Sequence, residues 1–402
     1  MTIEIRSPAQ DEWRAAMTAA SSVFGEDLKD DDYERYSSAL VRERFYTAYD
    51  GDVPVGTAAD FPFRLTVPGG ELAAGGVTWV AVLPTHRRQG VLTQLMRREL
   101  DDLHERQEPL AVLWASEAAI YGRFGYGVAA PHFEMEADGS RFSLRDDPGS
   151  TAKVRAPALE DAVDPCMRVY ERLRKTTPGF TARSREWWQA FRLADPEQWR
   201  RGASAKQVAL VEVDGEAEAY AIYRVKHDWN AGFPKGQVRV VEALAATPSA
   251  ERDLWRFLFG IDLTVRVESR VDPASPLPLM VVDARSLNMR LNEGLWLRIV
   301  EVGGALAGRS YATEESVVLE VRDEFCPWNA GRWRVGGGGA ERTQDDADLE
   351  LDVADLASVY LGAFSFTRLA TAERVRELKA GAVVRADELF RTPRPPYCPE
   401  EF

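Results

Sequence analysis

The residues from Val77 to Gly127 read VTWVAVLPTHRRQGVLTQLMRRELDDLHERQEPLAVLWASEAAIYGRFGYG, and this stretch decides the fold. Its β-branched and aromatic start predicts a strand that ends at Pro84, because proline cannot continue a strand ladder. Apolar residues then recur at helical spacing from Leu92 to Leu103, which predicts an amphipathic helix directly after the strand. The connecting turn therefore places two arginines and a glycine at the start of a helix.

That turn has the composition of an anion-binding loop. Gly90 has no Cβ, so backbone amides can approach a ligand closely, and the first turn of a helix adds unpaired N–H groups and a positive dipole end. A plain solvated turn is the alternative that this fragment alone leaves open. We expect phosphate groups to bind at Arg87, Arg88, Gln89, Gly90, Val91, Leu92 and Thr93.

A second apolar run, Leu110–Trp114, predicts a strand after the helix, and the motif YGRFGYG follows at residues 121–127. An aromatic, glycine-rich turn in the core is one interpretation of this motif. A tyrosine just beyond the second strand also suits proton donation to a thiolate, because the pKa of a phenol, roughly 10, lies near that of a thiol, roughly 8.5. Tyr126 is the candidate acid, and we interpret Tyr121, its competitor, as a packing residue.

The pattern R-x-x-G-x-L resembles the pyrophosphate loop of the GNAT N-acetyltransferases, whose usual form is Q/R-x-x-G-x-G/A, and Leu92 departs from the small final residue. The segments VAVLPTHRRQG and LWASEAAIYGRFGYG and the terminus Glu400-Glu401-Phe402 resemble the Eis (enhanced intracellular survival) acetyltransferases, and this resemblance spans the whole chain. It implies an acetyl-CoA-dependent enzyme that acetylates amines of aminoglycosides, often at several positions.

The resemblance also implies roles for individual residues. The carboxylate of Phe402 is the general base, and Tyr126 is the general acid. Acetyl-CoA lies between the two strands and contacts Val80, Ala81, Val82, Arg87, Arg88, Gln89, Gly90, Val91, Leu92, Thr93, Ser116 and Glu117. The acceptor pocket contains Phe24, Glu26, Tyr36, Trp79, Trp114 and Glu401.

Length and composition set broad limits. The 402 residues suggest two or three domains of roughly 150 residues each. With 45% hydrophobic residues and no uninterrupted apolar run near 20 residues, we expect a globular chain without a membrane span. The N-terminus lacks an apolar signal region, which predicts a cytoplasmic location.

Charge and thiols restrict the ligands. The formal net charge of −14 argues against nucleic acid and anionic membranes and favours a polycationic acceptor. The three cysteines are widely spaced, so we expect neither a disulfide framework nor a zinc site. The four histidines have no metal-ligand spacing, and no metal is expected. His86 is notable because it lies in the cofactor loop.

We expect an α+β chain of three domains. Residues 1–150 form the catalytic GNAT domain, in which Phe133–Asp138 and Arg141–Leu144 supply the final strands, and 146–152 form a linker. Residues 151–290 repeat the strand, helix and strand pattern, but Ser249–Asp253 replaces the arginine and glycine loop. This second GNAT-like copy is therefore predicted to be degenerate and structural.

Residues 291–402 form the third domain, which resembles a sterol carrier protein, with antiparallel strands under helices at Val353–Leu361 and Ala370–Leu378. Gly336–Gly339 is interpreted as a hairpin tip, because no helix or lysine follows it. The prolines of the tail stiffen it, so that Phe402 can enter the cleft of the first domain.

The sequence leaves other functions open. Protein lysines or polyamines are alternative acceptors on the same fold. A lipid-binding or assembly protein without catalysis is a further alternative, against which the intact Arg87–Gly90 loop weighs. A homohexamer is implied by the resemblance alone.

Overall fold

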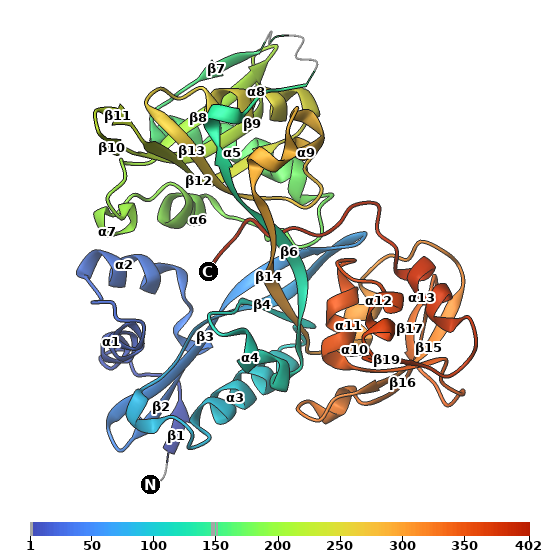
Figure 1. Cartoon of the computed structure of the whole chain (residues 1–402). Coiled ribbons are helices and arrows are strands. Elements are labelled where there is room, and N and C mark those ends of the chain that lie inside the picture. The colour runs from blue at the N-terminus through green and yellow to red at the C-terminus, as the bar shows by residue number, and fades with distance from the viewer. Residues whose placement is uncertain (1–2, 146–148, 150–151) are drawn as a thin grey trace. The chain divides into compact units, whose positions relative to one another are not determined.

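The computed structural model describes residues 3–145, 149 and 152–402 (Figure 1). It divides into two compact units. The first comprises Met1–Ala130, Gly294–Pro396 and Glu400–Phe402, and the second comprises Pro131–Glu293 and Tyr397–Pro399. The predicted linker at 146–152 lies mainly outside the described residues.

The first unit contains a mixed sheet. Its strand order is β1 (Ile3–Arg6), β2 (Phe45–Asp50), β3 (Val53–Val67), β4 (Gly70–Val82), β5 (Leu110–Trp114) and β14 (Met289–Ile299). β4 and β5 are parallel, and the other neighbours are antiparallel. Helix α3 (Val91–Glu105) packs against one face of this sheet, and α1 (Trp13–Val23) packs against β3 and β4. The shorter elements are α2 (Asp30–Ala39), η1 (Arg42–Arg44), η2 (Pro84–His86), α4 (Ala118–Tyr121) and η3 (Gly122–Phe124).

The alternation of β2 explains how the two faces form. Phe45 packs edge-on against Trp13 of α1, while its neighbour Tyr46 joins the cluster that contains Val91 and Leu95 of α3. Successive residues of a strand point to opposite faces, so a run of buried residues serves a sheet covered on both sides. This arrangement leaves the carboxyl end of β4 between the helices that flank it.

Two strands pair outside the part of the chain in which they occur. β6 (Tyr126–Asp138) follows the strands of the first sheet in sequence but pairs with the second, and β14 follows the strands of the second sheet but pairs with the first. Residues Phe133–Asp138 of β6 pair with β13 (Thr264–Val271), in the second unit. Residues Leu295–Ile299 of β14 pair with β5, in the first unit. Our prediction that Phe133–Asp138 completes the first sheet was therefore wrong. An alternating pattern shows that a segment is a strand, but it does not identify the partner strand.

The second predicted closing strand, Arg141–Leu144, was also wrong. Residues Gly139–Arg141 form a short 3-10 helix, η4, in which the Asp138 side chain accepts a hydrogen bond from the Ser140 amide. Leu144 makes one isolated bridge with Val281. An aspartate that bonds the backbone two residues ahead favours a turn over a strand.

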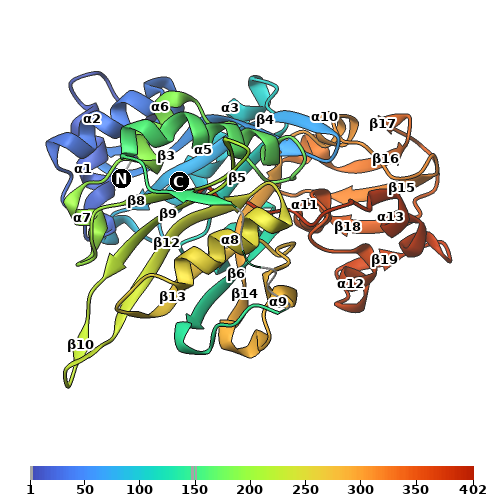
Figure 2. The same cartoon turned by 90° about the horizontal axis from the view of Figure 1, so that it is seen from above.

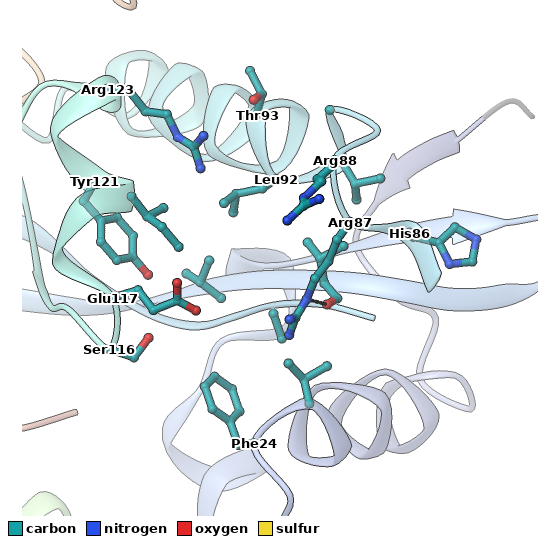
Figure 3. Close-up of a pocket in the computed structure, with 17 residues that line it drawn as sticks. Phe24, His86, Arg87, Arg88, Leu92, Thr93, Ser116, Glu117, Tyr121 and Arg123 are labelled. Carbon is teal, nitrogen blue, oxygen red and sulfur yellow. Dashed lines mark hydrogen bonds between the residues drawn. The ribbon is translucent and has the colours of Figure 1, made fainter. Parts of the chain in front are cut away.

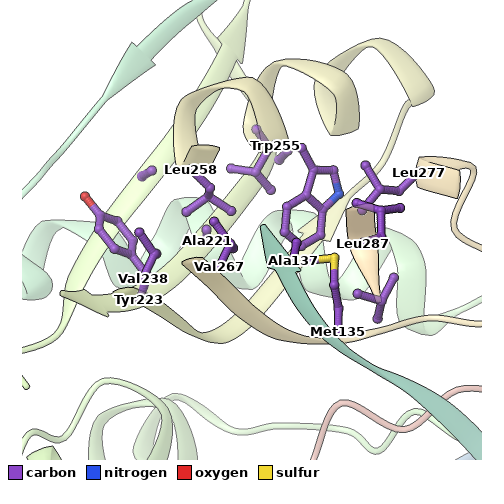
Figure 4. Close-up of a cluster of buried hydrophobic side chains, with 14 of the residues drawn as sticks. Met135, Ala137, Ala221, Tyr223, Val238, Trp255, Leu258, Val267, Leu277 and Leu287 are labelled. Carbon is purple, nitrogen blue, oxygen red and sulfur yellow. The ribbon is translucent and has the colours of Figure 1, made fainter. Parts of the chain in front are cut away.

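The second unit repeats the strand, helix and strand pattern. Its sheet has the order β6, β13, β12 (Gly236–Ala245), β9 (Glu216–Lys226), β8 (Gln207–Val213) and β7 (Lys153–Arg155). β12 and β13 are parallel and are connected by α8 (Pro248–Phe259), which lies along the sheet in Figure 2. Figure 4 shows Trp255 and Leu258 of α8 packed near Met135 and Ala137 of the exchanged strand β6.

The other elements of the second unit are short, apart from one amphipathic helix. They are α5 (Leu159–Arg174), α6 (Arg185–Trp187), the π-helical η5 (Trp188–Arg192), α7 (Glu197–Arg200), β10 (Trp229–Asn230), β11 (Phe233–Pro234), α9 (Leu277–Met280) and η6 (Ala284–Leu287). Trp188 is buried with α5 in a second core cluster.

The C-terminal part of the first unit has its own sheet. The strand order is β17 (Gly339–Arg342), β16 (Gly331–Gly336), β15 (Ser316–Arg322), β18 (Leu349–Asp352) and β19 (Val375–Glu377). Gly336 pairs with Gly339, which confirms the predicted hairpin tip. The helical elements are α10 (Val302–Ala307), η7 (Pro327–Asn329), α11 (Val353–Tyr360), α12 (Phe366–Thr371) and α13 (Ala382–Phe390).

Two details of this part differ from expectation. β15 and β18 are parallel, although we predicted an antiparallel sheet. The predicted helix at Ala370–Leu378 ends as α12 at Thr371, and β19 follows it. Glu373 adopts a positive φ of 59°, a conformation that interrupts a helix. In the part of the chain that the structure describes, no helix has the length and apolar character needed to cross a membrane.

Candidate active site

A bulge in β4 creates the site. The register between β3 and β4 shifts between Thr57 and Ala59, opposite Trp79, whose φ is 53°. The Thr57 hydroxyl donates a 2.6 Å hydrogen bond to the Trp79 carbonyl and holds this conformation. A bulge bends and twists a strand. Pairing between β4 and β5 runs only from Ala74 to Gly76 on β4, so the strand edge beyond Gly76 is left without β5 as a partner.

The turn after β4 forms the start of α3. Gly90 is the N-terminal cap of this helix and has a φ of 81°, and a Cβ there would meet no atom within 4 Å. Glycine is therefore favoured by the backbone conformation and not by crowding. Arg88 also has a positive φ, 61°, which costs energy for a residue with a side chain. Both arginines of the turn are exposed.

A cavity of about 410 Å³ lies between this turn and the motif YGRFGYG (Figure 3). Helix α3 contributes its first turn, β4 its end, and α1 its last residue and the one that follows. The cavity is lined by Val23, Phe24, Val80, Ala81, Val82, His86, Arg87, Arg88, Gly90, Val91, Leu92, Thr93, Ser116, Glu117, Ile120, Tyr121 and Arg123.

The structure thus brings together nearly all of the residues predicted to contact the cofactor. Gln89 is the exception, because its side-chain amide donates a 3.1 Å hydrogen bond to the Thr85 carbonyl and it does not line the cavity. The cavity suits an elongated anionic ligand, since it joins a helix N-terminus and three arginines to a free strand edge.

The two tyrosines of the motif have different environments. Tyr121 lines the cavity, and Figure 3 shows its hydroxyl directed toward Glu117. Burial raises the pKa of Tyr121 to about 12, and Glu99 and Glu117 contribute in the same direction. Tyr126 lies behind it in the core, with ring centroids 5.9 Å apart, and does not line the cavity. Burial also raises the pKa of Tyr126 well above that of a free phenol.

The glycines of the motif allow close packing from the C-terminal part of the unit. Gly125 has a φ of 81°, and a Cβ there would lie 2.8 Å from the guanidinium carbon of Arg298. Arg298 is fully buried and donates to both carboxylate oxygens of Asp323, at 2.7 and 2.9 Å. A Cβ at Gly127 would overlap the Ala354 carbonyl of α11. Arg298 of β14 and Ala354 of the sterol-carrier-like part therefore pack directly against the glycines of the motif.

The predicted acceptor residues occupy several positions around the bulge. Trp79 packs edge-on against Tyr36, with ring centroids 5.1 Å apart. Phe24 lines the cavity and is 52% exposed, and Glu26 is exposed close after it in the chain. Burial raises the pKa of Tyr36, and the charges of Asp32 and Glu26 raise it further.

Trp114 is not among the residues that line the cavity. It ends β5 opposite Leu295 of β14 and is partly buried there. Its place in the acceptor pocket therefore stays a prediction, as does that of Glu26, Tyr36, Trp79 and Glu401, which do not line the cavity either.

The last residue of the tail contacts β3 of the first unit. The ring of Phe402 packs edge-on against Phe63 of β3, with centroids 4.9 Å apart. A Cβ on Gly76 would overlap the Phe63 ring, and Gly76 is the last β4 residue paired with β5. Glu400 is fully buried, and Glu401 is exposed.

Sequence reasoning missed some lining residues, namely Val23, Ile120, Tyr121 and Arg123. Tyr121 was considered and assigned to packing. The overlooked signal is the short helix Ala118–Tyr121. It directly follows the predicted cofactor residue Glu117, so residues at its end, Ile120 and Tyr121, can face the same cavity. His86 lines the cavity, as its place in the loop suggested, and its Nδ1 lies 2.8 Å from the Thr85 hydroxyl.

Three family models match the chain in order. An acetyltransferase (GNAT) domain matches residues 4–129, a second acetyltransferase (GNAT) domain matches residues 179–299, and a sterol carrier protein domain matches residues 302–399. The α+β class and the order of two GNAT folds and a sterol-carrier-like domain are therefore confirmed.

Relatives extend over the complete chain. A Streptomyces avermitilis protein described as an uncharacterized N-acetyltransferase is 43% identical over 410 residues, and N-acetyltransferase Eis of Mycobacterium tuberculosis is 34% identical over 424 residues; each alignment covers 100% of both chains. The crystal structure of Eis1 from Mycobacterium abscessus superposes with a TM-score of 0.85 at 31% identity, again over 100% of both chains.

Fold, site and relatives together define a GNAT N-acetyltransferase. Within this class, the chain belongs to the Eis family, as the sequence resemblance indicated.

Proposed function

We propose that this chain transfers the acetyl group of acetyl-CoA to amines of polycationic acceptors, among them aminoglycosides, in the cavity of the first unit. The observation that carries the proposal is the junction, in one cavity, of a helix N-terminus with arginines, an unpaired strand edge and a protonated phenol. GNAT enzymes use acetyl-CoA as the acetyl donor, and this cavity offers complementary groups to its phosphates and its amide arm.

The anionic end of the donor would bind around the start of α3. The amides after Gly90 and the guanidinium of Arg88 suit the pyrophosphate. Arg123 faces the same cavity from the other side, and we assign the 3′-phosphate of the donor to it. Val80, Ala81 and Val82 would pair with the amide arm along the free edge of β4.

We assign the general acid to Tyr121 in place of Tyr126. A proton donor must reach the departing thiolate, and Tyr121 lines the cavity whereas Tyr126 lies in the core. The raised pKa of Tyr121 keeps its hydroxyl protonated at neutral pH. The departing thiolate is the conjugate base of a thiol whose ordinary pKa is roughly 8.5, and Tyr121 would donate its proton to the sulfur within a hydrogen bond as the carbon–sulfur bond breaks.

The terminal carboxylate of Phe402 is the proposed general base. An amine must be neutral to attack the thioester, so a carboxylate near the opening would remove its proton, directly or through water. The contact between Phe402 and Phe63, next to Gly76, supports this role, because it holds the last residue beside the point where β4 and β5 separate.

A polycationic acceptor suits the carboxylates that follow the cavity residue Phe24 in the chain. Helix α2 begins with Asp30, Asp31 and Asp32, and Glu26 precedes it close to the cavity residue Phe24. Carboxylates bind ammonium groups through charge-assisted hydrogen bonds, and several of them would admit an acceptor in more than one orientation. Acetylation at several positions, a homohexamer and a cytoplasmic location belong to the same proposal.

Thiol release tests the proposal. The full chain is incubated with acetyl-CoA and, separately, an aminoglycoside such as kanamycin, a linear polyamine and a lysine peptide. We expect thiol release with the aminoglycoside, and mass spectrometry should show one or more added acetyl groups. Release with the peptide alone would favour the protein-lysine alternative. Release with none of the amines would contradict the proposed function.

A further inference from the structure

A buried carboxyl group lies behind the proposed acid and has no role in the mechanism above. Glu99, on α3, is fully buried. Among the residues that the structure describes, neither of its carboxyl oxygens has a hydrogen-bond partner. Such a group is costly to bury, so its presence in a well-packed core calls for an explanation.

A second unpaired polar group lies in the same core. The hydroxyl of Tyr126 is buried and has no hydrogen-bond partner within the described part of the chain. Tyr126 shares a core cluster with Met96 and Leu100, the α3 residues that flank Glu99 on the buried side, and with Tyr121. The two unpaired groups and the proposed acid therefore lie together between α3 and the sheet.

We propose that Glu99 and Tyr126 form a buried proton store that returns a proton to Tyr121 while the donor fills the cavity. The inference rests on the proposed function, because it gives Tyr121 the role of acid. Glu99 and Tyr126 do not line the cavity, so they act through Tyr121 and are positioning residues. No direct hydrogen bond joins the two groups, so one buried water would connect them, a usual partner for otherwise unpaired polar groups.

The protons balance in three steps. Tyr121 loses its O–H proton to the sulfur of the leaving thiolate, and an S–H bond forms. The Tyr126 hydroxyl then gives its proton to the Tyr121 phenolate through a buried water, and the Glu99 carboxylic acid gives its proton to the Tyr126 phenolate in the same way, so Glu99 ends as a carboxylate. Once the products leave, the Glu99 carboxylate takes back a proton from Tyr126, Tyr126 takes one from Tyr121, and solvent in the cavity then protonates the Tyr121 phenolate.

The surroundings keep Glu99 neutral before turnover. Burial raises the pKa of Glu99 well above that of a free carboxyl group, and the charge of Asp60 on β3 adds to this effect. Burial raises the pKa of Tyr126, and the positive charge of Arg298 on β14 partly offsets this by lowering it. The charged and titratable groups that act on the pair are Asp60, Arg44, Arg106, Asp102, Tyr121, Arg298 and Cys326.

Kinetics with matched variants test the store. Glu99→Gln keeps the size of the side chain but cannot supply the proton, and Tyr126→Phe removes the second member. Each should lower kcat about tenfold with KM for acetyl-CoA unchanged, and the double variant should lose no more than either alone, since the residues act as one unit. Glu105→Gln, at the exposed end of α3, is the matched control. In a Tyr121→Phe background, Glu99→Gln should have no further effect.

Two measurements on the resting protein are independent of turnover. The infrared spectrum at neutral pH should contain a protonated carboxyl band that Glu99→Gln lacks. The wild type should also lose stability relative to Glu99→Gln as the pH rises above the ordinary carboxyl pKa of roughly 4.3, because the folded state retains a proton that the unfolded state releases.

The outcomes separate this inference from the function on which it rests. Wild-type kcat in both Glu99→Gln and Tyr126→Phe, or an infrared band that is absent in the wild type, would overturn the proton store while leaving acetyl transfer intact. Absence of thiol release by the wild type would overturn the proposed function and the store together. If Glu99→Gln does not fold, Tyr126→Phe and the wild-type infrared spectrum decide.

Discussion

The first turns of α3 and α8 occupy the same place in two copies of one fold, yet they leave different groups open. At α3, Gly90 offers no side chain to the amides that follow, and the adjoining arginines are exposed. At α8, the Thr247 hydroxyl accepts a 3.3 Å hydrogen bond from the Ala250 amide, and Glu251 places a carboxylate at the dipole end. At the start of α8, a side chain of the chain itself accepts a hydrogen bond from a backbone N–H group. At the start of α3, no side chain caps the helix, so its N–H groups are available to an anion.

The strands before these helices show the same contrast. β12 has a register shift between Val240 and Glu242, like the bulge at Trp79 on β4. In the second unit, however, Glu242 is buried and accepts hydrogen bonds from Arg183, at 2.6 and 2.9 Å, and from Tyr220. Burial alone would raise the pKa of Glu242, but Arg183 holds it below its ordinary value. The bulge is therefore a property of the fold, while the ligand cavity depends on what fills the adjacent space.

The largest expected effect separates the two tyrosines of the first copy. Tyr121→Phe should lower kcat with acetyl-CoA and an aminoglycoside by about 10²–10³-fold, because it removes the acid that reaches the thiolate. Tyr126→Phe should have a smaller effect, about tenfold, because Tyr126 acts only through Tyr121. Steady-state thiol release measures both. A stronger loss in Tyr126→Phe than in Tyr121→Phe would show that the acid is assigned to the wrong tyrosine.

The next prediction compares an arginine just before α3 with an arginine in the first part of α8. Arg88→Glu should raise KM for acetyl-CoA about 10–100-fold, since a charge-assisted contact worth about 1.5–3 kcal/mol is lost and a repulsion is added. Arg252→Glu, in the first part of α8, should leave KM unchanged. Equal changes in both variants would mean that the two helix starts do not differ as proposed.

A smaller effect concerns Arg123. Wild-type protein should prefer acetyl-CoA to its dephospho form, which lacks the 3′-phosphate, and Arg123→Gln should reduce that preference about tenfold, because the 3′-phosphate loses its partner. The ratio of kcat/KM for the two donors is the measurement, and Arg141→Gln in the second unit is the control. An unchanged ratio would remove Arg123 from donor recognition.

The smallest effect is one of stability. Thr247→Ala should lower the free energy of unfolding by about 1 kcal/mol, the usual cost of losing an N-cap, and should leave KM for acetyl-CoA unchanged. Gly90→Ala should cost a similar amount, about 1–2 kcal/mol, because alanine is strained at a φ of 81°. Urea denaturation measures both. A change of KM in Thr247→Ala would indicate a ligand at α8.

Local features of the site could be predicted from the sequence. The loop from Arg87 to Gly90 was predicted because composition, turn chemistry and the following helical period agree within a few residues. The loss of the loop at Ser249–Asp253 was predicted for the same reason, and α8 indeed begins at Pro248 with an acidic first turn.

The features that escaped prediction depend on distant residues. The exchange of β6 and β14 is a choice of partners, which no local pattern specifies. The orientation of Tyr121 and Tyr126 follows from the positive φ of Gly125 and from the close approach of Arg298 and Ala354, which are far away in the sequence. A linear motif therefore identified the segment but did not show that Tyr121, and not Tyr126, lines the cavity.

Calorimetric titration of the wild-type chain with acetyl-CoA tests the central claim most directly, because it counts the sites. The account predicts one acetyl-CoA per chain, with binding strongly weakened by Arg88→Glu and unaffected by Arg252→Glu. Two sites per chain, or binding that does not respond to Arg88→Glu, would contradict the claim that only the first copy holds the donor.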